Sequence, residues 1–526
     1  MKKLLIAVLC AAAPVALHAE QWQVLGTRPM GMGGAFVAVA QGPAAQYWNP
    51  GGLVKSSDNV SGMDIHAGVN AEFTGGIVKN ASQIGDLSSQ FSAIKTAQTN
   101  GTAVNAQDAA AFVKTLSLLS DMNKPGKGAL VEADGGVNFK FSKVALSVNN
   151  FTAVGANPFV DTTNVGLGSG TGVNGVKMNS VTNSDVIAPT DPTQAAAATT
   201  IAGAITTIGY TNLEDLICGG AGCLSTQTSG KITDSTTLAN AFVNLAATSL
   251  TSAQIADAAS MMSQYAASAA PIIANAASGN SYTNNTSKLT LDAASFTEIA
   301  AGYAWTADKW LSGLSIGGNL KAVNGRMATT TFQFMNNSNT GDAFKNVLKD
   351  SKSTWAPAVD VGALWDVNRK YPKLPLHPRL GLVVRNVNSP KFDMPDAPGD
   401  PGGKYKLDRQ ARIGLALNPA HFWTIAADMD LTKNKTEVSG YNSRQLALGT
   451  EINIINRRAF NIPLRAGIMK NLADSSSKLA YTAGTGLNLL YMHFDVSGVV
   501  SSQKTTLDNS SIPTKVGVSA SFGLLF

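Results

Sequence analysis

Residues 411–417 read Ala-Arg-Ile-Gly-Leu-Ala-Leu, and residues 423–431 read Trp-Thr-Ile-Ala-Ala-Asp-Met-Asp-Leu. In both stretches, large apolar side chains alternate with small, polar or charged ones. Successive side chains of a β-strand point to opposite faces of the sheet, so a period of two predicts strands with one apolar and one polar face. Residues 446–454 continue this alternation, and the second half of the chain is therefore expected to be β-structure.

The strand segments are about 9 to 13 residues long, which is long for soluble domains and suits tilted membrane strands. A soluble β-sandwich shows the same alternation, but isolated charges of both signs on the polar faces and aromatic residues near the strand ends favour a membrane barrel. We therefore predict an all-β membrane protein, an antiparallel transmembrane β-barrel of about 14 strands. A lumen of that width needs a plug or forms a channel. The expected strands lie near residues 60–72, 129–142, 143–154, 295–306, 311–326, 355–367, 378–389, 409–418, 421–433, 442–455, 462–470, 478–489, 491–502 and 514–526.

The chain stops inside its last expected strand, and that strand ends on an aromatic residue. Its apolar face carries Val516, Val518, Ala520, Phe522, Leu524 and Phe526. A terminal strand of this kind resembles the signal by which outer-membrane barrels are recognised for assembly. We therefore assign Phe522, Leu524 and Phe526 as an assembly signal, with the barrel assembly machinery as the implied partner.

The N-terminus predicts export. A basic start at Lys2 and Lys3 precedes an apolar run over residues 4–15, and Ala19 fits a cleavage position, so residues 1–19 are interpreted as a signal peptide. The run is shorter than the roughly 20 residues that a spanning helix needs, although an N-terminal anchor is the alternative. Export, strands and a charged fraction of only 14% together predict a Gram-negative outer-membrane location in contact with lipid. The formal charge of +6 contains no basic block, so no nucleic-acid partner is expected.

Two cysteines remain after the expected cleavage, Cys218 and Cys223. A pair separated by four residues in an oxidising compartment is most simply a local disulfide. A redox pair is the alternative, but that chemistry uses a tighter Cys-x-x-Cys at a helix N-terminus. A metal site would need further ligands close by, so we expect no metal and no cofactor.

Two stretches do not follow the strand pattern. Residues 81–128 contain a helical apolar stripe within a region of first barrel strands that we place at residues 54–154. Residues 155–290 form an Ala/Thr/Ser-rich insertion with a capping box at Thr251 and Gln254, before the main barrel at residues 291–526. Long excursions of such barrels lie outside the cell and the periplasmic turns are short, so the insertion is expected to be extracellular and both termini periplasmic.

The region near the N-terminus carries a family resemblance. Residues 28–35 read Arg-Pro-Met-Gly-Met-Gly-Gly-Ala, and residues 47–53 read Tyr-Trp-Asn-Pro-Gly-Gly-Leu. Together with residues 411–417, 427–433 and 464–467 they resemble barrels related to the long-chain fatty acid transporter FadL, and more closely the outer-membrane family labelled conjugal transfer protein TraF. The resemblance touches both ends of the mature chain but not the insertion.

The resemblance implies that residues 20–53 fold into the lumen as a plug or hatch, and it marks Gly31, Gly33, Gly34, Asn49 and Pro50. Glycines allow the backbone to approach closely in a crowded lumen, and Asn-Pro-Gly is a turn signal. The related transporters carry Asn-Pro-Ala, where this chain has Gly51. A structural plug without gating is as consistent with the residues as a gate.

The polar strand faces supply candidate binding residues in the lumen. Opposite charges on neighbouring strands commonly pair, so ion pairs within the wall are the simpler interpretation of these side chains. The alternative hypothesis is that Arg379, Arg385, Arg412 or Arg465 binds the carboxylate of an amphiphile, because a planar guanidinium suits a carboxylate. The lumen charges proposed are Arg379, Arg385, Arg412, Asp428, Asp430, Glu451 and Arg465.

No enzyme motif stands out: the sequence has no HExxH or Walker loop, and we expect neither catalytic residues nor an enzyme. Two functions remain. The first is passive uptake of hydrophobic or amphipathic small molecules through a plugged barrel. The alternative is a structural barrel in a conjugation or secretion complex that transports nothing. A continuous apolar pocket beneath the insertion would favour uptake, and a solid polar plug would favour the structural role.

Overall fold

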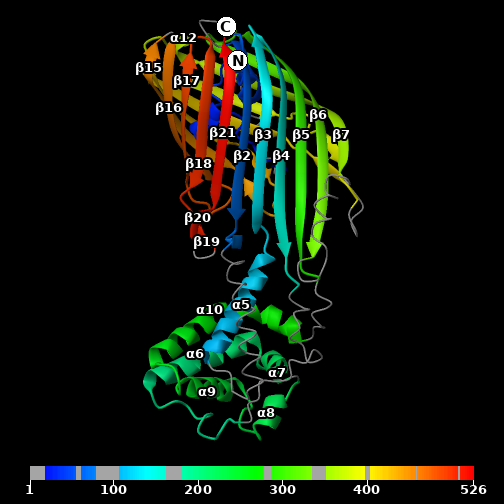
Figure 1. Cartoon of the computed structure of the whole chain (residues 1–526), viewed down its shortest axis with the longest axis vertical. Coiled ribbons are helices and arrows are strands. Elements are labelled where there is room, and N and C mark those ends of the chain that lie inside the picture. The colour runs from blue at the N-terminus through cyan, green and yellow to red at the C-terminus, as the bar shows by residue number, and fades with distance from the viewer. Residues whose placement is uncertain are drawn as a thin grey trace.

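The computed structural model describes residues 18–54, 61–78, 106–161, 180–218, 220–277, 286–333, 351–396, 403–457, 459–507 and 510–525. Its main body is a closed antiparallel barrel of 14 strands (Figure 1). The first and last strands, β2 and β21, pair with each other from Gly62↔Leu525 to Glu72↔Lys515 and so close the barrel. In order around the barrel the strands are β11 (Gln410–Ala420), β12 (Trp423–Asp430), β15 (Gln445–Arg457), β16 (Phe460–Asn471), β17 (Ala480–Leu489), β18 (Met492–Ser501), β21 (Lys515–Leu525), β2 (Gly62–Thr74), β3 (Gly128–Phe141), β4 (Val144–Phe159), β5 (Lys288–Thr306), β6 (Leu314–Gln333), β7 (Lys352–Asp366) and β8 (Arg379–Arg385).

The barrel confirms the strand count and the place of every predicted strand. The boundaries differ most around the insertion, where β4 continues to Phe159 and β5 already begins at Lys288. The sequence there is rich in Ala, Thr and Asn, and such residues give little contrast between the two faces of a strand. Cross-strand pairing with β6 to Lys288↔Gln333 supplies the order that the side-chain pattern does not predict.

The two faces of the wall differ as the alternation predicts. On β21, Val516 and Val518 point outward and are exposed, whereas Ser519 and Ser521 are buried on the lumen side. Phe522 and Leu524 share the outward face of Val518, and Phe522 pairs with Ile65 of β2 and Phe494 of β18. Phe526 lies outside the described residues.

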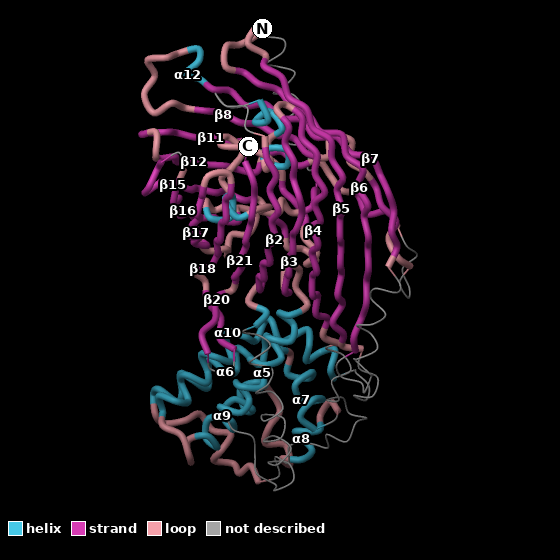
Figure 2. The backbone as a smooth tube through the Cα atoms, turned by 45° about the horizontal axis from the view of Figure 1, so that its top comes forward, coloured by secondary structure: helices cyan, strands magenta, loops and turns pink. Residues whose placement is uncertain are grey.

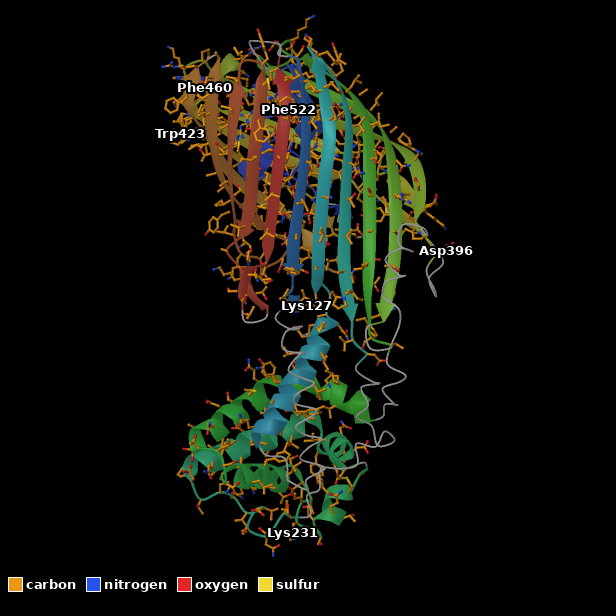
Figure 3. All side chains as sticks on the ribbon, viewed as in Figure 1. Lys127, Lys231, Asp396, Trp423, Phe460 and Phe522 are labelled. Atoms are coloured by element: carbon orange, nitrogen blue, oxygen red, sulfur yellow. A yellow bond between two sulfur atoms is a disulfide. The ribbon has the colours of Figure 1, made fainter. Side chains whose placement is uncertain are left out.

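The connections at the two ends of the barrel differ in length. At one end β3–β4, β11–β12 and β17–β18 are joined by two residues each. At the other end, the connections include residues 75–127 and 160–287. We call these the short-turn end and the long-loop end. Figure 3 places Trp423 and Phe460 at the short-turn end and Lys231 at the far tip of the helical part beyond the long-loop end.

The helical part consists of α5 (Ala106–Met122), α6 (Pro192–Ile208), α7 (Tyr210–Cys218), α8 (Cys223–Gln227), α9 (Ser235–Ala246) and α10 (Ser252–Ala277) (Figure 2). The helices share one apolar core, to which Leu116, Ile201, Phe242 and Ile255 contribute. The capping box predicted at Thr251 and Gln254 is present, with the Thr251 amide donating to the Gln254 side chain at 2.9 Å. None of the helices described is long and apolar enough to cross a membrane.

A disulfide joins Cys218 and Cys223, as predicted. It links the end of α7 to the start of α8, within the helical part and outside the barrel wall. Glu214 of α7 supports the same corner, because its carboxylate accepts hydrogen bonds from the amides of Gly222 and Leu224 at 2.9 and 3.1 Å.

Residues 431–444, which join β12 to β15, cross the lumen at the long-loop end. The Tyr441 hydroxyl donates to Glu72 of β2 at 2.7 Å, and the Asn157 side chain of β4 donates to the Glu437 carbonyl at 3.0 Å. This connection contains β13 (Lys433–Lys435) and β14 (Asn442–Ser443), which pair with each other.

Further short elements that the sequence did not predict are β9 (Lys391–Asp393), β10 (Lys404–Lys406), β19 (Lys504–Leu507), β20 (Ser510–Pro513) and α12 (Val367–Lys370).

The N-terminal segment, residues 21–54, lies inside the barrel and is almost entirely buried. It contains α2 (Thr27–Gly31), α3 (Ala45–Trp48) and the 3₁₀-helix η1 (Pro50–Val54). It is preceded by β1 (His18–Glu20), which pairs in parallel with β13. The first described residues therefore lie beside the connection at the long-loop end, whereas Leu525 lies at the short-turn end. The C-terminal strand thus ends at the short-turn end, as expected, whereas residues 1–17 lie outside the described part of the chain.

Candidate functional site: the N-terminal segment and the lumen wall

Glycines bring the N-terminal segment into direct contact with the wall backbone. Gly33 has φ +68, and a side chain there would lie 2.8 Å from the Ile468 carbonyl oxygen of β16. Gly31 accepts a 3.1 Å hydrogen bond from the Thr482 hydroxyl at its carbonyl, and Gly34, with φ +88, lies against Val24 and Ala447. On the wall, a side chain at Gly449 would overlap Met32. Glycines on both partners thus allow a backbone-to-wall contact that larger residues would prevent.

Asn49 and Pro50 hold the other end of the segment near the short-turn end. The Asn49 amide nitrogen donates to the carbonyls of Val37, at 3.1 Å, and Ala363 of β7, at 3.0 Å. Its oxygen accepts from the Gly51 amide at 3.1 Å. The departure from Asn-Pro-Ala has a steric reason here, because a Cβ at Gly51 would lie 2.9 Å from the Leu364 backbone nitrogen.

Asp428 of β12 binds the middle of the segment. One carboxylate oxygen accepts the backbone amides of Phe36 and Val37 at 2.7 and 2.8 Å. Gly414 of β11 lies beside it, and a side chain there would meet Val37. This contact satisfies two backbone donors that sit outside any helix or strand.

Aromatic side chains of the segment enclose two wall arginines. Trp22, Phe36, Tyr47 and Trp48 pack edge-to-face or tilted, with centroids 5.6–6.2 Å apart. The Arg385 guanidinium lies 4.0 Å from the Tyr47 ring centroid, and that of Arg412 lies 4.6 Å from the Trp22 centroid. Cation–π attraction is strongest where water is excluded, so these contacts fix the segment against β8 and β11.

Three of the four predicted lumen arginines already bind carboxylates of the wall. Arg385 pairs with Glu298 at 2.8 Å, and Arg412 pairs with Asp430 at 2.6 Å. Arg465 joins Glu451 and Asp495, each at 2.6 Å. Removing one partner of a buried ion pair leaves an uncompensated charge. These three arginines therefore stabilise the wall through their ion pairs.

Arg379 differs from these three. Its Nη2 donates to the Asn418 side chain at 3.0 Å, and its buried Nε reaches no hydrogen-bond acceptor among the residues described. It lies close enough to Arg28 of α2 for the two charges to act on each other. Arg28 itself forms a two-bond pair with Glu451, from Nε to Oε2 and from Nη2 to Oε1, each at 2.8 Å. Arg28 was part of the family motif, but no binding role was predicted for it, although it is the only charged residue in residues 21–54.

Cavities lie near both ends of the lumen. One of about 440 Å³ lies toward the short-turn end, between the N-terminal segment and the wall, with Arg28, Phe36, Asp64, His493 and Arg465 among its lining residues. Another of about 180 Å³ lies toward the long-loop end beside Asp292, Tyr405 and Glu437. Burial raises the pKa of Glu437 to about 7, against the effect of the Tyr405 hydroxyl that donates to it.

The described residues contain no group of His, Cys, Asp or Glu that could hold a metal ion. The arrangement is that of a wall and a segment joined by hydrogen bonds, one ion pair and cation–π contacts. These contacts are all non-covalent.

Known proteins were compared with the whole chain. No curated protein matches it. Among solved structures, the Pseudomonas putida toluene transporter TodX is 10% identical, with 97% of this chain and 99% of that chain covered and a TM-score of 0.40. A Pseudomonas aeruginosa FadL homologue is 8% identical, with the same coverages and a TM-score of 0.34. A family model described as "F plasmid transfer operon, TraF, protein" matches residues 224–430, which is less than half of the chain. Over those residues, from α8 to the end of β12, this chain is similar to the TraF family.

Proposed function

We propose that this chain is an outer-membrane barrel that passes small amphipathic molecules when its N-terminal segment, acting as a plug, moves aside. The observation that carries the proposal is the arrangement of the lumen. A segment held only by non-covalent contacts separates a cavity of about 440 Å³ near the short-turn end from one of about 180 Å³ near the long-loop end. Moving the segment would join the two spaces.

The outer surface of the barrel supports a membrane location. Outward side chains along the strands are apolar and exposed, as at Val69, Leu320 and Val518. Exposed aromatic residues occur near both ends of the wall, with Trp305 and Trp423 at the short-turn end and Trp355 at the long-loop end. Aromatic belts of this kind mark the two interfaces of barrel proteins.

The unequal connections support an orientation. Outer-membrane barrels have short periplasmic turns and longer extracellular loops, so the helical part would face the outside. Cleavage after Ala19, as the sequence predicts, would remove two residues of β1 and leave the chain starting at Glu20, beside β13. The N-terminal segment would then enter the lumen from the extracellular side.

A disulfide between segment and wall tests the proposal. A Cβ at Gly34 would lie 3.9 Å from that of Ala447, within the range of disulfides. We expect the variant Gly34→Cys/Ala447→Cys, with Cys218 and Cys223 replaced by serine, to block influx of benzenesulfonate into liposomes when oxidised and to restore it when reduced. The matched control is Gly34→Ser/Ala447→Ser, which carries the same backbone strain but no bond. Equal influx in both redox states would overturn the proposal.

The alternative is a structural barrel that transports nothing. The observation in its favour is the extent of buried contact between segment and wall, including the two amides on Asp428 and the aromatic cover of Arg385 and Arg412. If neither the native chain nor the reduced double-cysteine variant admits benzenesulfonate, while both are folded, this alternative stands.

A further inference from the structure

Arg28 occupies a special position in the N-terminal segment. It is the one charged residue of residues 21–54, and it lines the cavity of about 440 Å³. Its side chain is 25% exposed, whereas its ion-pair partner Glu451 and the second partner of that carboxylate, Arg465, are 7% and 4% exposed. Of these three side chains, Arg28 is therefore the one that a molecule in the cavity can reach.

Glu451 does not depend on Arg28 alone. Arg465 binds the same carboxylate at 2.6 Å and is itself held by Asp495. If Arg28 leaves, Glu451 keeps a partner, so the step does not leave an isolated buried charge on the wall. Arg28, in contrast, would have no carboxylate within its own segment, because residues 21–54 contain no Asp or Glu.

The formal charges that line the cavity are balanced. The cavity lining contributes Arg28, Lys140 and Arg465 against Asp64, Glu451 and Asp495, which balance if His493 is neutral. Arg379 lies outside this lining; it donates to the neutral Asn418, and Asp366 of β7 lies opposite it in the sheet register. A carboxylate ligand would therefore replace Glu451 on Arg28, and Arg465 would continue to balance Glu451.

Resting on the proposed function, we propose that the cavity binds a small organic monocarboxylate, which takes Arg28 from Glu451 and thereby releases the segment from the wall. The planar guanidinium offers a carboxylate the same two parallel hydrogen bonds that it gives Glu451. The apolar part of the ligand lies against Phe36 and Pro463, which line the same cavity. The volume suits a molecule of the size of benzoate.

The direct test is equilibrium dialysis of benzoate, with neutral benzamide and cationic benzylammonium as comparisons, against the folded full chain in detergent. We expect benzoate to bind most tightly and Arg28→Gln to weaken its binding at least tenfold. Glu451→Gln removes the competitor while keeping a hydrogen-bond partner for Arg465, so it should tighten benzoate binding several-fold. Arg369→Gln, which changes an exposed arginine of α12 outside the cavity, should leave binding unchanged.

The Glu451→Gln arm distinguishes this proposal from misfolding, because damage to the fold would not tighten binding. Weaker benzoate binding in Glu451→Gln, unchanged binding in Arg28→Gln, or tighter binding of benzylammonium than of benzoate would each overturn it. Dialysis measures binding without passage, so a chain that binds benzoate but shows no redox-dependent influx in the tethered variant would overturn the proposed function and the release of the segment, and not the binding of the carboxylate at Arg28.

Discussion

The backbone amide of Phe36 donates a 2.7 Å hydrogen bond to the carboxylate of Asp428 on β12, inside the barrel. The same oxygen also accepts the amide of Val37 at 2.8 Å. Both residues of the segment and Asp428 are buried, so water does not compete for these bonds. A single wall side chain thereby supplies the acceptor for two consecutive backbone donors. Asp428 therefore anchors the segment without using a side chain of the segment itself.

Asp428→Ala is expected to loosen the segment without opening the barrel wall. Two buried amides lose their acceptor, at a cost of about 1–3 kcal/mol each. Planar-bilayer recordings should show more frequent and longer openings than the native chain. Asp428→Asn, which keeps an acceptor oxygen, should show a smaller effect, and Asp396→Ala, which removes an exposed carboxylate, should show none. Native-like recordings from Asp428→Ala would contradict the role of this anchor.

The wall of the barrel could be predicted from the sequence because the alternation of side chains within each strand is enough to identify the strand and its two faces. Alternation within β11, β12 and β15 specifies which face each side chain takes, and fourteen such segments specify the barrel. The partner of each lumen charge could not be predicted in this way. Parity places Arg379 and Arg385 on the same face of β8, yet Arg385 meets Glu298 from β5 and Arg379 meets only the side chain of Asn418 among the residues described. That difference depends on contacts across the lumen.

The N-terminal segment shows the same limit more clearly. Its glycines predicted close approach, but they did not specify that Gly33 would meet β16 and Gly51 would meet β7. The short strands β1 and β13 pair across more than 400 residues of sequence, and neither has enough residues to show a period of two. Arg28 could have been found from sequence by one signal, its isolation as the only charge in an apolar, glycine-rich stretch.

The last strand offers a test of barrel closure. Phe522 of β21 faces outward between Ile65 and Phe494 of the two neighbouring strands. Phe522→Asp should place a charge on the lipid face at the closing seam, where its destabilising effect depends on depth and stays below the about 2–4 kcal/mol of an Arg or Lys at the midplane. We expect little heat-modifiable barrel in outer-membrane fractions. Leu490→Asp is the control, because Leu490 is exposed in a two-residue turn with φ +52, which Asp tolerates. A normal yield from Phe522→Asp would contradict the proposal that this strand directs assembly.

The disulfide between Cys218 and Cys223 should matter only locally. The two cysteines are five positions apart, so the bond removes little entropy from the unfolded chain, below about 3 kcal/mol. Cys218→Ser/Cys223→Ser should leave the heat-modifiability of the barrel unchanged and should increase hydrogen exchange at the α7–α8 corner. The native, non-reduced chain should not react with a thiol reagent at these positions. Loss of the barrel in the double variant would show that the bond acts beyond the helical part.

Asp234 gives the helical part a dependence on acid. It caps α9, and its carboxylate accepts the amides of Thr236 and Thr237 at 2.9 and 2.8 Å. The bond from the Thr237 amide is the main reason that the pKa of Asp234 lies below its usual value. A carboxyl group with a lowered pKa in the folded state stabilises that state above its usual pKa of about 3.9, and the effect is lost as the pH falls through the lowered value.

Hydrogen exchange of α9 should therefore rise as the pH is lowered below about 4, after correction for the intrinsic rate. Asp234→Asn keeps a good cap that does not titrate, so α9 should remain ordered and this part of its pH dependence should disappear. Asp234→Ala removes the cap at every pH and should cost about 1 kcal/mol of local stability. Amides in β11 and β12 provide the internal reference, because they lie in the barrel and do not contact α9. The same acid-dependent exchange in Asp234→Asn as in the native chain would show that another group is responsible.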